Sequence, residues 1–431
     1  MEGSITQLNL SNYLINDSIA KVSYFRHSYF NYNNFVFDTR RIPLQSTSKF
    51  GGSNSCRLDL NNYGDLITNI ILEVDLPDIS NIITLDSNNI GYANGIGNVL
   101  IQNIELRING EKIDSQNSIF RDIWSSITIP PGNQLNYNNM IKKYDNFSSS
   151  SFKGGKIFIP FMHWFCHYTN QKDHSLVLPI AALYNQTIEI IITFAPFINC
   201  VVSSTNSTPL TTVEIVNSSL LVDYVSLEET ERIALQKPGI IKSFMITQTG
   251  NLSFSIPAGT KNTTFSLKQI NYLVSELLII AQRTDVGSAP RNDYFNYTNQ
   301  IGLTNRISPI KKMTLKFDGK DKFTDIPAQY FYSIVPLKCH SNVITNNFIN
   351  CISFALYPEK IEQPSGLCNF SEIQDPLLLL EFEDNLPALN IFIYYINYNM
   401  LENKDGCVSL LHSMSKSIPT NVARIKNIMR T

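Results

Sequence analysis

Two segments half a chain apart share one pattern of apolar and turn residues. IQNIELRINGEK, from Ile101 to Lys112, aligns without a gap with IKKMTLKFDGKD, from Ile310 to Asp321, at an offset of 209 residues in a chain of 431. LPIAALYNQTIEIIITF, from Leu178, has a counterpart in LPALNIFIYYINYNM, from Leu386, at an offset of 208 residues. Two matches at nearly one offset predict that the chain is a duplication of one domain.

Length and composition also favour two compact domains. A single hydrophobic core stops growing near roughly 250 to 300 residues, so 431 residues exceed what one core serves. Hydrophobic residues make up 43% of the chain and charged residues only 16%, which is too apolar for a disordered chain. We therefore expect two folded domains, each of about half the chain.

Period-two alternation of apolar and polar residues is the dominant local pattern. In the segment Ile104–Ile108 the apolar side chains share one face of an extended strand. Asn109-Gly110 and Asp318-Gly319 follow the two repeated strands and suit the positive φ of tight hairpins. The same alternation predicts strands at Leu66–Leu76, Ile188–Phe194, Phe244–Ile246, Leu273–Ile280, Met313–Phe317, Cys351–Leu356 and Ile391–Tyr398.

These patterns predict an all-β fold. About 200 residues hold eight strands with long loops, which fits an antiparallel sandwich of two sheets with Greek-key connections, the jelly roll among them. The predicted fold class is two tandem jelly-roll domains, each an eight-stranded antiparallel β-sandwich, with few short helices. Propellers and solenoids would show shorter repeats.

One helix is expected at the middle of the chain. In SLEETERIALQKP, Ser226 is placed to cap the first turn and Glu229 to reach back as a capping box. Pro238 and Gly239 end the helical pattern. The position of this helix between two equal halves predicts a linker between the domains.

Charge and targeting signals exclude several classes of protein. Lys and Arg total 34 against 36 for Asp and Glu, and no long run has one sign, so direct nucleic-acid binding is not expected. The tail from Asn421 to Thr431 carries three basic residues and could contact an anionic surface, or be a plain solvated terminus. The sequence shows no signal peptide and no apolar run long enough to span a membrane.

The histidines and cysteines give one weak candidate for a metal site. His163, Cys166 and His167 lie in FMHWFCHYTN, with His174 beyond, and imidazole and thiolate are zinc ligands. On a strand, however, His163 and Cys166 would point to opposite faces. An aromatic strand packed at a domain or subunit interface is therefore favoured over a metal site. The seven cysteines include no C-x-x-C pair, which is typical of reduced, buried thiols in a cytosolic product. No metal ligand and no cofactor is predicted.

Acidic and glycine-rich segments do not assemble into a catalytic site either. The simplest interpretation of the first acidic group is solvated charges on a surface helix, at Glu228, Glu229 and Glu231. The second group lacks the regular ligand spacing of a calcium loop and consists of Glu381, Glu383 and Asp384. Gly51-Gly52 and Gly154-Gly155 lack the spacing and the following Lys of a phosphate loop. No nucleophile, base and oxyanion hole are identified, so no catalytic residue is predicted and the chain is not expected to be an enzyme.

Seven segments in collinear order give the chain a resemblance to a known family. They are SKFGGSNSCRLDLNNYGDLITNIILEVDLP from Ser48, IGNVLIQNIELRINGEKID from Ile96, FRDIW from Phe120, FIPFMHWFC with the Leu178 segment, LEETERIALQ, PIKKMTLKFDGKDKF from Pro309, and ISFALYPEKIEQPSGLCNFSEI from Ile352. Together they resemble the major capsid proteins of nucleocytoplasmic large double-stranded DNA viruses, the double jelly-roll family that includes chlorella viruses, iridoviruses, marseilleviruses and giant viruses.

The resemblance implies a domain plan and an assembly. It implies an N-terminal arm over residues 1–25, a first jelly roll over 26–222, a linker with a short helix over 223–237, and a second jelly roll over 238–431. It implies that three chains form a pseudo-hexagonal homotrimer, a capsomer, that tiles an icosahedral shell. Residues 285–305 and 130–154 are then expected to be exposed, variable loops.

Partners and location follow from the same resemblance. The implied partners are the chain itself, neighbouring capsomers, minor capsid and penton proteins, and the inner membrane through the N-terminal arm. No direct nucleic-acid contact and no small-molecule substrate is implied. The implied location is the virion capsid, with late expression and assembly in the host cytoplasm.

Two alternatives stay open from the sequence alone. A carbohydrate-binding β-sandwich protein shares this architecture, and a fold does not fix a function. Within the viral interpretation, the chain could instead be a minor capsid paralogue.

Overall fold

The chain is described by a computed structural model. The described residues are 19–22, 27–30, 35–58, 63–82, 90–144, 152–166, 176–184, 186–203, 213–237, 242–287, 292–300, 306–343, 348–404 and 407–411.

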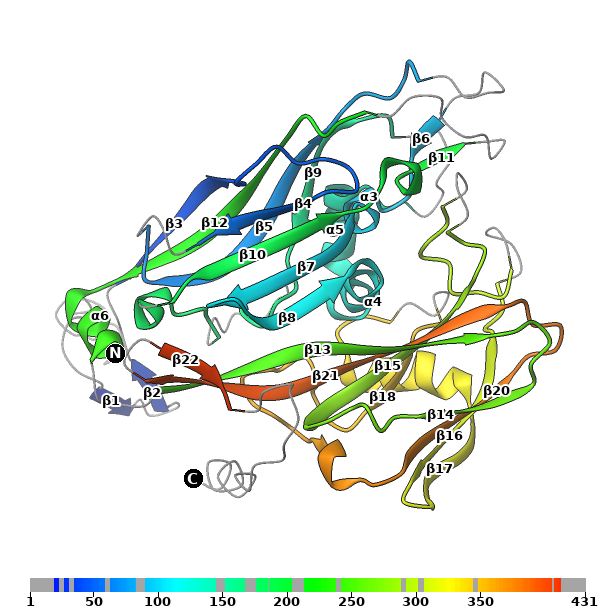
Figure 1. The fold of residues 1–431 in the computed structure, drawn as a ribbon. Helices are drawn as coiled ribbons and strands as arrows, with labels where there is room; N and C mark the ends of the chain where they lie inside the picture. Colours follow the sequence, from blue (N-terminus) through cyan, green and yellow to red (C-terminus); the bar gives the residue numbers. More distant parts are fainter. Residues whose placement is uncertain are drawn as a thin grey trace.

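The first half contains two antiparallel four-stranded sheets (Figure 1). In one sheet the order is β4 (Ser53–Arg57), β10 (Ile188–Phe194), β7 (Ile101–Ile108) and β8 (Glu111–Asn117). In the other it is β3 (Phe35–Pro43), β12 (Asn217–Leu227), β5 (Leu66–Leu76) and β9 (Gly155–Pro160). The described residues of this half also contain two short strand pairs and several helical segments: β1 (Ile19–Val22) with β2 (His27–Phe30), β6 (Ile90–Tyr92) with β11 (Val201–Ser203), α3 (Ile96–Val99), α4 (Ser118–Thr128), α5 (Pro131–Ile141), η1 (Ile180–Leu183) and η2 (Phe197–Asn199).

The second half repeats this plan after α6 (Glu229–Gln236). One sheet has the order β13 (Lys242–Ile256), β21 (Leu389–Lys404), β15 (Leu273–Arg283) and β18 (Asn350–Ser353), with β19 (Cys368–Asn369) beside β15 and β22 (Cys407–Leu410) beside β21. The other has the order β14 (Asn262–Ser266), β20 (Pro376–Phe382), β16 (Ile310–Phe317) and β17 (Lys320–Pro327). Its helical segments are η3 (Tyr330–Ile334), α7 (Val335–Cys339) and η5 (Phe370–Glu372).

The strand orders of the two halves correspond sheet by sheet. The order β4-β10-β7-β8 has the same connectivity as β14-β20-β16-β17, and β3-β12-β5-β9 has the same connectivity as β13-β21-β15-β18. The repeated segments form the same hairpin in each half, with φ of 50° and 80° at Asn109 and Gly110 and of 51° and 76° at Asp318 and Gly319. Positive φ at both central residues matches the right-handed twist of the flanking strands. The predicted all-β fold of two related sandwiches is confirmed.

The second repeat match, however, is wrong. The strand after Leu178 is β10, which pairs with β7 and β4, whereas the strand after Leu386 is β21, which pairs with β13 and β15 in the opposite kind of sheet. The counterpart of β10 is β20. Apolar strands that follow Leu-Pro look alike in sequence, and only the pairing tells them apart.

Strand positions agree with the prediction better than strand lengths do. The bounds of β5 and β10 are those predicted, but β13 has 15 residues and β21 has 16. These two strands are long because one end of each extends beyond its own sandwich and packs against the first half, where Ile246 and Leu401 join the core.

The helices differ more from the prediction. Ser226 lies in β12, and α6 begins after Glu228, which makes no side-chain capping bond, so the predicted capping box is wrong. Of the α-helices in the described ranges only α6 was predicted, and α3, α4, α5 and α7 were not. Helix α5 occupies part of the segment 130–154 that was expected to be a loop.

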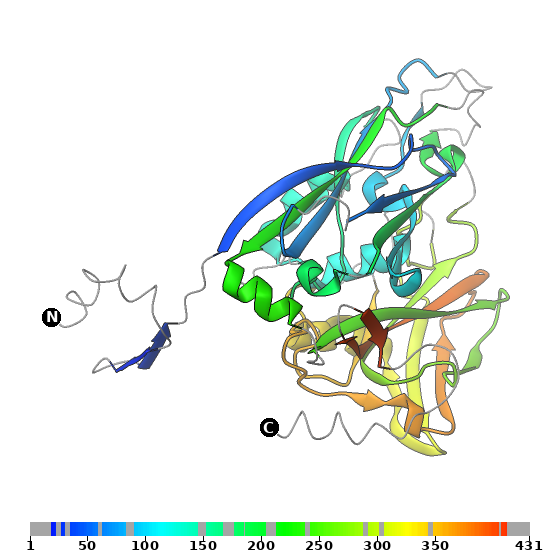
Figure 2. The same ribbon diagram turned by 60° about the vertical axis from the view of Figure 1, so that its left-hand side comes forward.

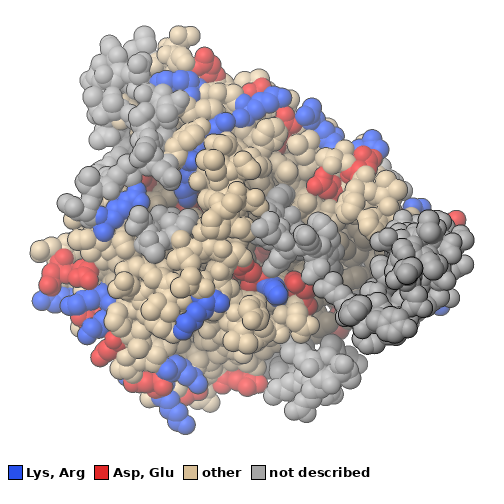
Figure 3. Space-filling model, turned by 180° about the vertical axis from the view of Figure 1, so that it is seen from behind, with Lys and Arg blue, Asp and Glu red and all other residues tan. Residues whose placement is uncertain are grey.

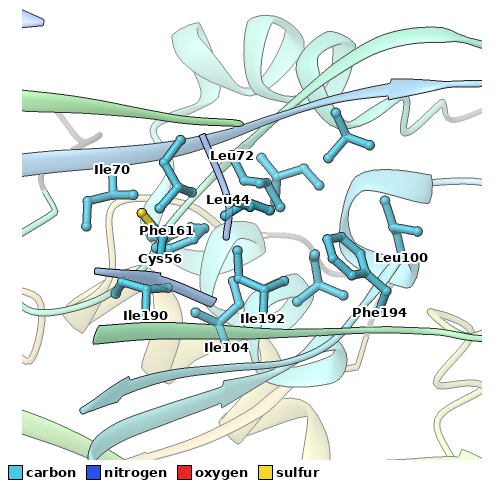
Figure 4. Close-up of a cluster of buried hydrophobic side chains, with 14 of the residues drawn as sticks. Leu44, Cys56, Ile70, Leu72, Leu100, Ile104, Phe161, Ile190, Ile192 and Phe194 are labelled. Atoms are coloured by element: carbon cyan, nitrogen blue, oxygen red, sulfur yellow. The ribbon is translucent and has the colours of Figure 1, made fainter. Parts of the chain in front are cut away.

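Two large apolar cores lie between the sheets, one in each half. Figure 4 shows part of the first, where side chains from β5, β7 and β10 point toward one another, among them Ile70, Ile104 and Ile190. Burial of apolar area is worth roughly 25 cal/mol per Å², so these cores are the main source of stability.

Candidate assembly surfaces

Helix α4 belongs to the first half in sequence but packs into the core of the second. Its buried residues Phe120, Ile123 and Ile127 recur at helical spacing and lie in the second core. Asn117 caps this helix by accepting a hydrogen bond from the backbone N–H of Phe120. Figure 1 shows the two halves stacked, with α4 on the side of the first half that faces β13 and β21.

The second half reaches into the first in the same way. Ile246 of β13, Leu401 of β21 and Leu410 of β22 are buried in the first core. Each half therefore completes the core of the other, and separating them would expose apolar area on both sides.

Asp114 of β8 is the centre of the polar contacts at this seam. Its carboxylate accepts hydrogen bonds from the backbone N–H of Thr249 in the second half at 2.9 Å and from Gln116 Nε2 at 3.0 Å. His163 Nδ1 lies 2.7 Å from Asp114 Oδ2, and both side chains are buried. Buried polar groups are costly unless they are paired, so this cluster favours one register of the two halves.

A second buried carboxylate at the seam is that of Asp122 on α4. Lys143 Nζ lies 2.5 Å from Asp122 Oδ1, and the Tyr297 hydroxyl donates to Asp122 Oδ2 at 3.0 Å. Burial and the Asp122 carboxylate raise the pKa of Tyr297 well above its usual range, so the phenol stays protonated and acts as a donor. The described residues 292–300 form a loop, as expected for 285–305, and Asp293 is exposed, but Tyr297 is fully buried, so the expected exposure is wrong at this residue.

Further hydrogen bonds join the halves along the rest of the seam. The Tyr394 hydroxyl donates to Asn117 Oδ1 at 2.9 Å, the backbone N–H of Asn342 donates to the carbonyl of Ile127 at 2.9 Å, and Asn403 Nδ2 donates to the carbonyl of Ala182 at 2.6 Å. With the shared apolar contacts, these bonds hold the two sandwiches in one relative orientation.

The described part of the candidate metal segment, which includes His163 and Cys166, is not arranged as a metal site. The segment after β9 is a turn rather than the expected strand, with the backbone N–H of Cys166 bonded to the carbonyl of His163. His163 is bound to Asp114, and burial raises the pKa of the Cys166 thiol to about 12, so it stays protonated. His167 and His174 lie outside the described residues. Among the residues that the structure describes, no three His, Cys, Asp or Glu side chains are grouped as metal ligands.

The acidic clusters named in the sequence analysis lie on the surface. Glu228 and Glu229 are exposed at the start of α6, and Glu381 contacts Lys311 at 3.3 Å on the outer face of β20. Glu383 and Asp384 follow at the end of that strand. These are surface charges, whose ion pairs contribute little to stability.

A further buried ionisable cluster, like that of Asp122, was not found by sequence reasoning. His340, after α7, has Nε2 3.1 Å from Glu276 Oε2 and Nδ1 3.1 Å from Glu359 Oε1, and its ring contacts that of Trp124 on α4. Burial alone would lower the pKa of His340, but Glu276, Cys351 and Glu359 raise it well above 6.5 overall. The cluster joins three segments far apart in sequence, so no local signal pointed to it.

The outer surface carries two groups of exposed apolar side chains. One is on β3, where Phe35, Val36 and Phe37 are 49%, 66% and 54% exposed. The other is around η3 and α7 and is formed by Tyr330, Ile334, Leu337, Leu356 and Tyr357. On the face shown in Figure 3, Lys and Arg are interspersed with Asp and Glu, with no broad area of one sign. Exposed apolar groups of this size are typical of protein contact surfaces.

None of the helices in the described ranges is both long and apolar enough to cross a bilayer.

Two family models together cover most of the chain. One is described as the major capsid protein N-terminus and matches residues 23–228, and the other is described as the large eukaryotic DNA virus major capsid protein and matches residues 236–409. The gap between the two matches contains most of α6.

Two curated relatives match over nearly their whole length. The chain is 25% identical to the major capsid protein of Pyramimonas orientalis virus, over 91% of this chain and 94% of that protein. It is 23% identical to the major capsid protein of Paramecium bursaria Chlorella virus 1, over 91% of this chain and 95% of that protein.

Solved structures share the fold. PBCV-1 VP54, in a crystal structure fitted into a reconstruction of the virophage Sputnik, superposes with a TM-score of 0.74 at 20% identity, covering 91% of this chain and 100% of that chain. The Faustovirus major capsid protein superposes with a TM-score of 0.71 at 10% identity, covering 88% of this chain and 92% of that chain. With the strand orders above, these likenesses establish a double jelly roll. The chain belongs to the major capsid protein family of large eukaryotic DNA viruses.

Proposed function

We propose that three copies of this chain form a pseudo-hexagonal capsomer that tiles the icosahedral shell of a large double-stranded DNA virus. The observation that carries this proposal is that two sandwiches of one strand order are fixed to each other through a shared seam. Three such pairs in a closed ring supply six similar units, and six units give the nearly hexagonal outline that a flat lattice needs.

The expected free energies favour a stable trimer that makes weaker, reversible contacts with neighbouring capsomers. Obligate subunit interfaces typically bury roughly 2,000 Å² or more, which at about 25 cal/mol per Å² is a large gross hydrophobic contribution before the entropy cost of association. Contacts between capsomers can be weaker, because many act at once. Weak single contacts also allow errors of assembly to reverse.

Within this proposal the chain has a structural role and no enzymatic one. The curated relatives are named as major capsid proteins, which supports a structural role. The partners are neighbouring capsomers, minor capsid and penton proteins, and the inner membrane. The protein resides in the virion capsid after assembly in the host cytoplasm.

The domain plan is part of the proposal. We assign residues 26–222 and 238–431 to the two jelly rolls, 223–237 to the linker, and 1–25 to an arm beneath the capsomer. In Figure 2 the hairpin of β1 and β2, which crosses the boundary at residue 25, lies apart from both sandwiches, and this supports an arm that continues to about residue 30 and docks only on assembly. Arg232 on α6 bonds to Asp65 at 2.8 Å, which ties the linker helix to the first half.

Light scattering on the purified full chain tests the proposal. The expected mass is three times 48.8 kDa at micromolar concentration. A stable monomer under these conditions contradicts it, and binding on a glycan array by such a monomer would favour a carbohydrate-binding protein.

A further inference from the structure

Strands β5 and β15 each contain a β-bulge at the equivalent position, and these bulges define which residues of the two halves correspond. In β5 the extra residue is Thr68, whose hydroxyl donates to the carbonyl of Asp223 at 3.3 Å, and in β15 it is Ser275, whose hydroxyl donates to the carbonyl of Ile396 at 3.2 Å. Asp223 and Ile396 are therefore counterparts.

This alignment extends to the outer strands of the same sheets. Asp223 pairs with Thr39 on β3, and Ile396 pairs with Thr249 on β13. Counting back from Thr39 and Thr249, the residues 35–38 of β3 correspond to 245–248 of β13. Val36 is then the counterpart of Ile246, and Asp38 that of Gln248.

The two strands differ in what covers them. Ile246 is fully buried against the first half, while its counterpart Val36 is 66% exposed. Gln248 Nε2 donates to the carbonyl of Ile113 on β8, which fixes β13 to β8 across the seam. No other part of the chain provides the same cover for β3 among the described residues.

The strand β17, the counterpart of β8, is open in the same way. Ile113 and Lys322 are the extra residues of equivalent bulges 209 positions apart, and Ile113 is buried whereas Lys322 is exposed. The helical segments that follow also differ, because α4 buries Ile123 and Ile127 whereas η3 and α7 leave Ile334 and Leu337 exposed. Within each chain, β8 and α4 of the first half are covered by β13 of the second half. Their counterparts, β17 with α7 and β3, are exposed.

We propose that β3 of one copy docks on β17 and α7 of the next copy, repeating between chains the contact that β13 makes with β8 and α4 within one chain. This inference rests on the proposed capsomer and names the surface that closes it. A contact between two different faces forms a ring or an open filament, and three copies with six sandwiches close as a ring. The apolar residues 35–37 supply the buried area.

The alignment also places opposite charges across this contact. Gln248 meets the backbone of Ile113 within the chain, so Asp38 is expected to meet Lys322 of the next copy. In the single chain Asp38 contacts Arg40, and the Lys322 ammonium lies 5.4 Å from the centre of the Phe317 ring. Both side chains are on the surface and can turn toward a partner.

A matched pair of valine variants tests the docking surface. Val36→Asp should raise the concentration at which half the chains are monomeric by more than about tenfold, because each contact would then bury a carboxylate among apolar groups. Val216→Asp is the control, since Val216 is similarly exposed at 64% and directly precedes β12 of the same sheet. Circular dichroism and light scattering on the full chain report folding and mass.

Charge reversal tests the register. Asp38→Lys and Lys322→Asp should each weaken the trimer, and the double variant should restore it toward the wild-type midpoint, because opposite charges again face each other. Both residues are on the surface, so this test stays informative if Val36→Asp fails to fold.

The outcomes distinguish a failure of the proposed contact between β3 and β17 from a failure of the proposed trimeric capsomer. A trimer that is unaffected by Val36→Asp, or single charge variants that the double variant does not rescue, overturns this contact and leaves the capsomer standing. A wild-type chain that stays monomeric overturns the capsomer itself. A trimer that is lost on deletion of residues 412–431, and not on the β3 changes, would assign the closing contact to the tail.

Discussion

The ring of Phe120, on a helix of the first half, lies 5.7 Å from the ring of Tyr394 on a central strand of the second. Trp124, one turn later on the same helix, stacks on Phe120 at 5.9 Å. Aromatic side chains bury more area than other residues and prefer such tilted or offset contacts. The contact between the two jelly rolls is thus packed like a hydrophobic core, which fixes their relative orientation.

Truncating Phe120 should therefore destabilise the whole chain. Phe120→Ala is expected to lower the free energy of unfolding by about 3 to 5 kcal/mol, because it opens a cavity where the two halves meet. Urea denaturation of the isolated chain measures this. Leu135→Ala on α5 is the control, since Leu135 is exposed and should change stability by less than about 0.5 kcal/mol. Equal effects of the two changes would show that the seam is not a core.

The repeated hairpin gives a second prediction. Gly319 has φ of 76°, and a Cβ added there would meet no atom within 4 Å, so Gly319→Ala should cost about 1 to 2 kcal/mol from backbone strain alone. Gly132→Ala is the matched control, because Gly132 lies in α5 with equally open surroundings and no positive φ. There alanine should be neutral or stabilising by up to about 1 kcal/mol. Thermal unfolding measures the difference in stability between the two variants. This difference should vanish only if the backbone at Gly319 is not left-handed.

The equivalent bulges give a third prediction. Ser275→Ala removes the hydroxyl that donates to the carbonyl of Ile396 and should cost about 1 kcal/mol, as a buried hydrogen bond does. Ser266→Ala, at an exposed position of β14, should cost much less. Chemical denaturation of the two variants side by side is the measurement. A cost for Ser266→Ala as large as that for Ser275→Ala would argue against a role of the bulge.

The buried histidine makes stability depend on pH. Burial favours the neutral ring of His340, but Glu276 and the other partners of the ring raise its folded-state pKa well above 6.5. Its stabilising contribution is therefore fully present below about pH 6.5 and is lost as the pH rises through the raised folded-state value. His340→Gln should cost about 3 to 5 kcal/mol near pH 6, because it leaves Glu276 without its buried cationic partner.

The gap between wild type and His340→Gln should narrow at alkaline pH. Denaturation curves at several pH values, from about pH 6 upward, measure this gap. His27 lies in strand β2, which is separate from both sandwiches in Figure 2, and His27→Gln should leave the pH dependence unchanged. A gap that is constant with pH would mean that His340 is neutral in the folded protein.

The sequence predicted the duplication from one correct match and one wrong one. Ile101–Lys112 and Ile310–Asp321 form equivalent hairpins because the strand pattern and the Asn-Gly or Asp-Gly turn are both local signals. The Leu178 and Leu386 segments matched only in apolar content, and apolar content does not tell which sheet a strand joins. Pairing across the sheet decides that, and it is not local.

The missed helices have different causes. In α4 the signal was present, since Asn117 precedes Phe120, Ile123 and Ile127 at helical spacing. In α5 it was absent, because the segment after Pro131 is rich in Asn and contains Gly132, which favours a loop. Tertiary packing of Tyr137 and Ile141 supplies what local propensity lacks.

The exposed apolar faces could not be predicted residue by residue. Phe35, Val36 and Phe37 look in sequence like any other strand of a core. Only the comparison with β13, where the corresponding Ile246 is buried, shows that this face of β3 has been left open. The buried contacts of His340 with Glu276 and Glu359 likewise bring together residues from distant segments.

An image of the purified particle tests the central claim most directly. Class averages from electron microscopy, viewed along the symmetry axis, should show a closed ring with three-fold symmetry and six similar lobes, one for each jelly roll. A single two-lobed particle, or a ring with another number of lobes, would contradict the account.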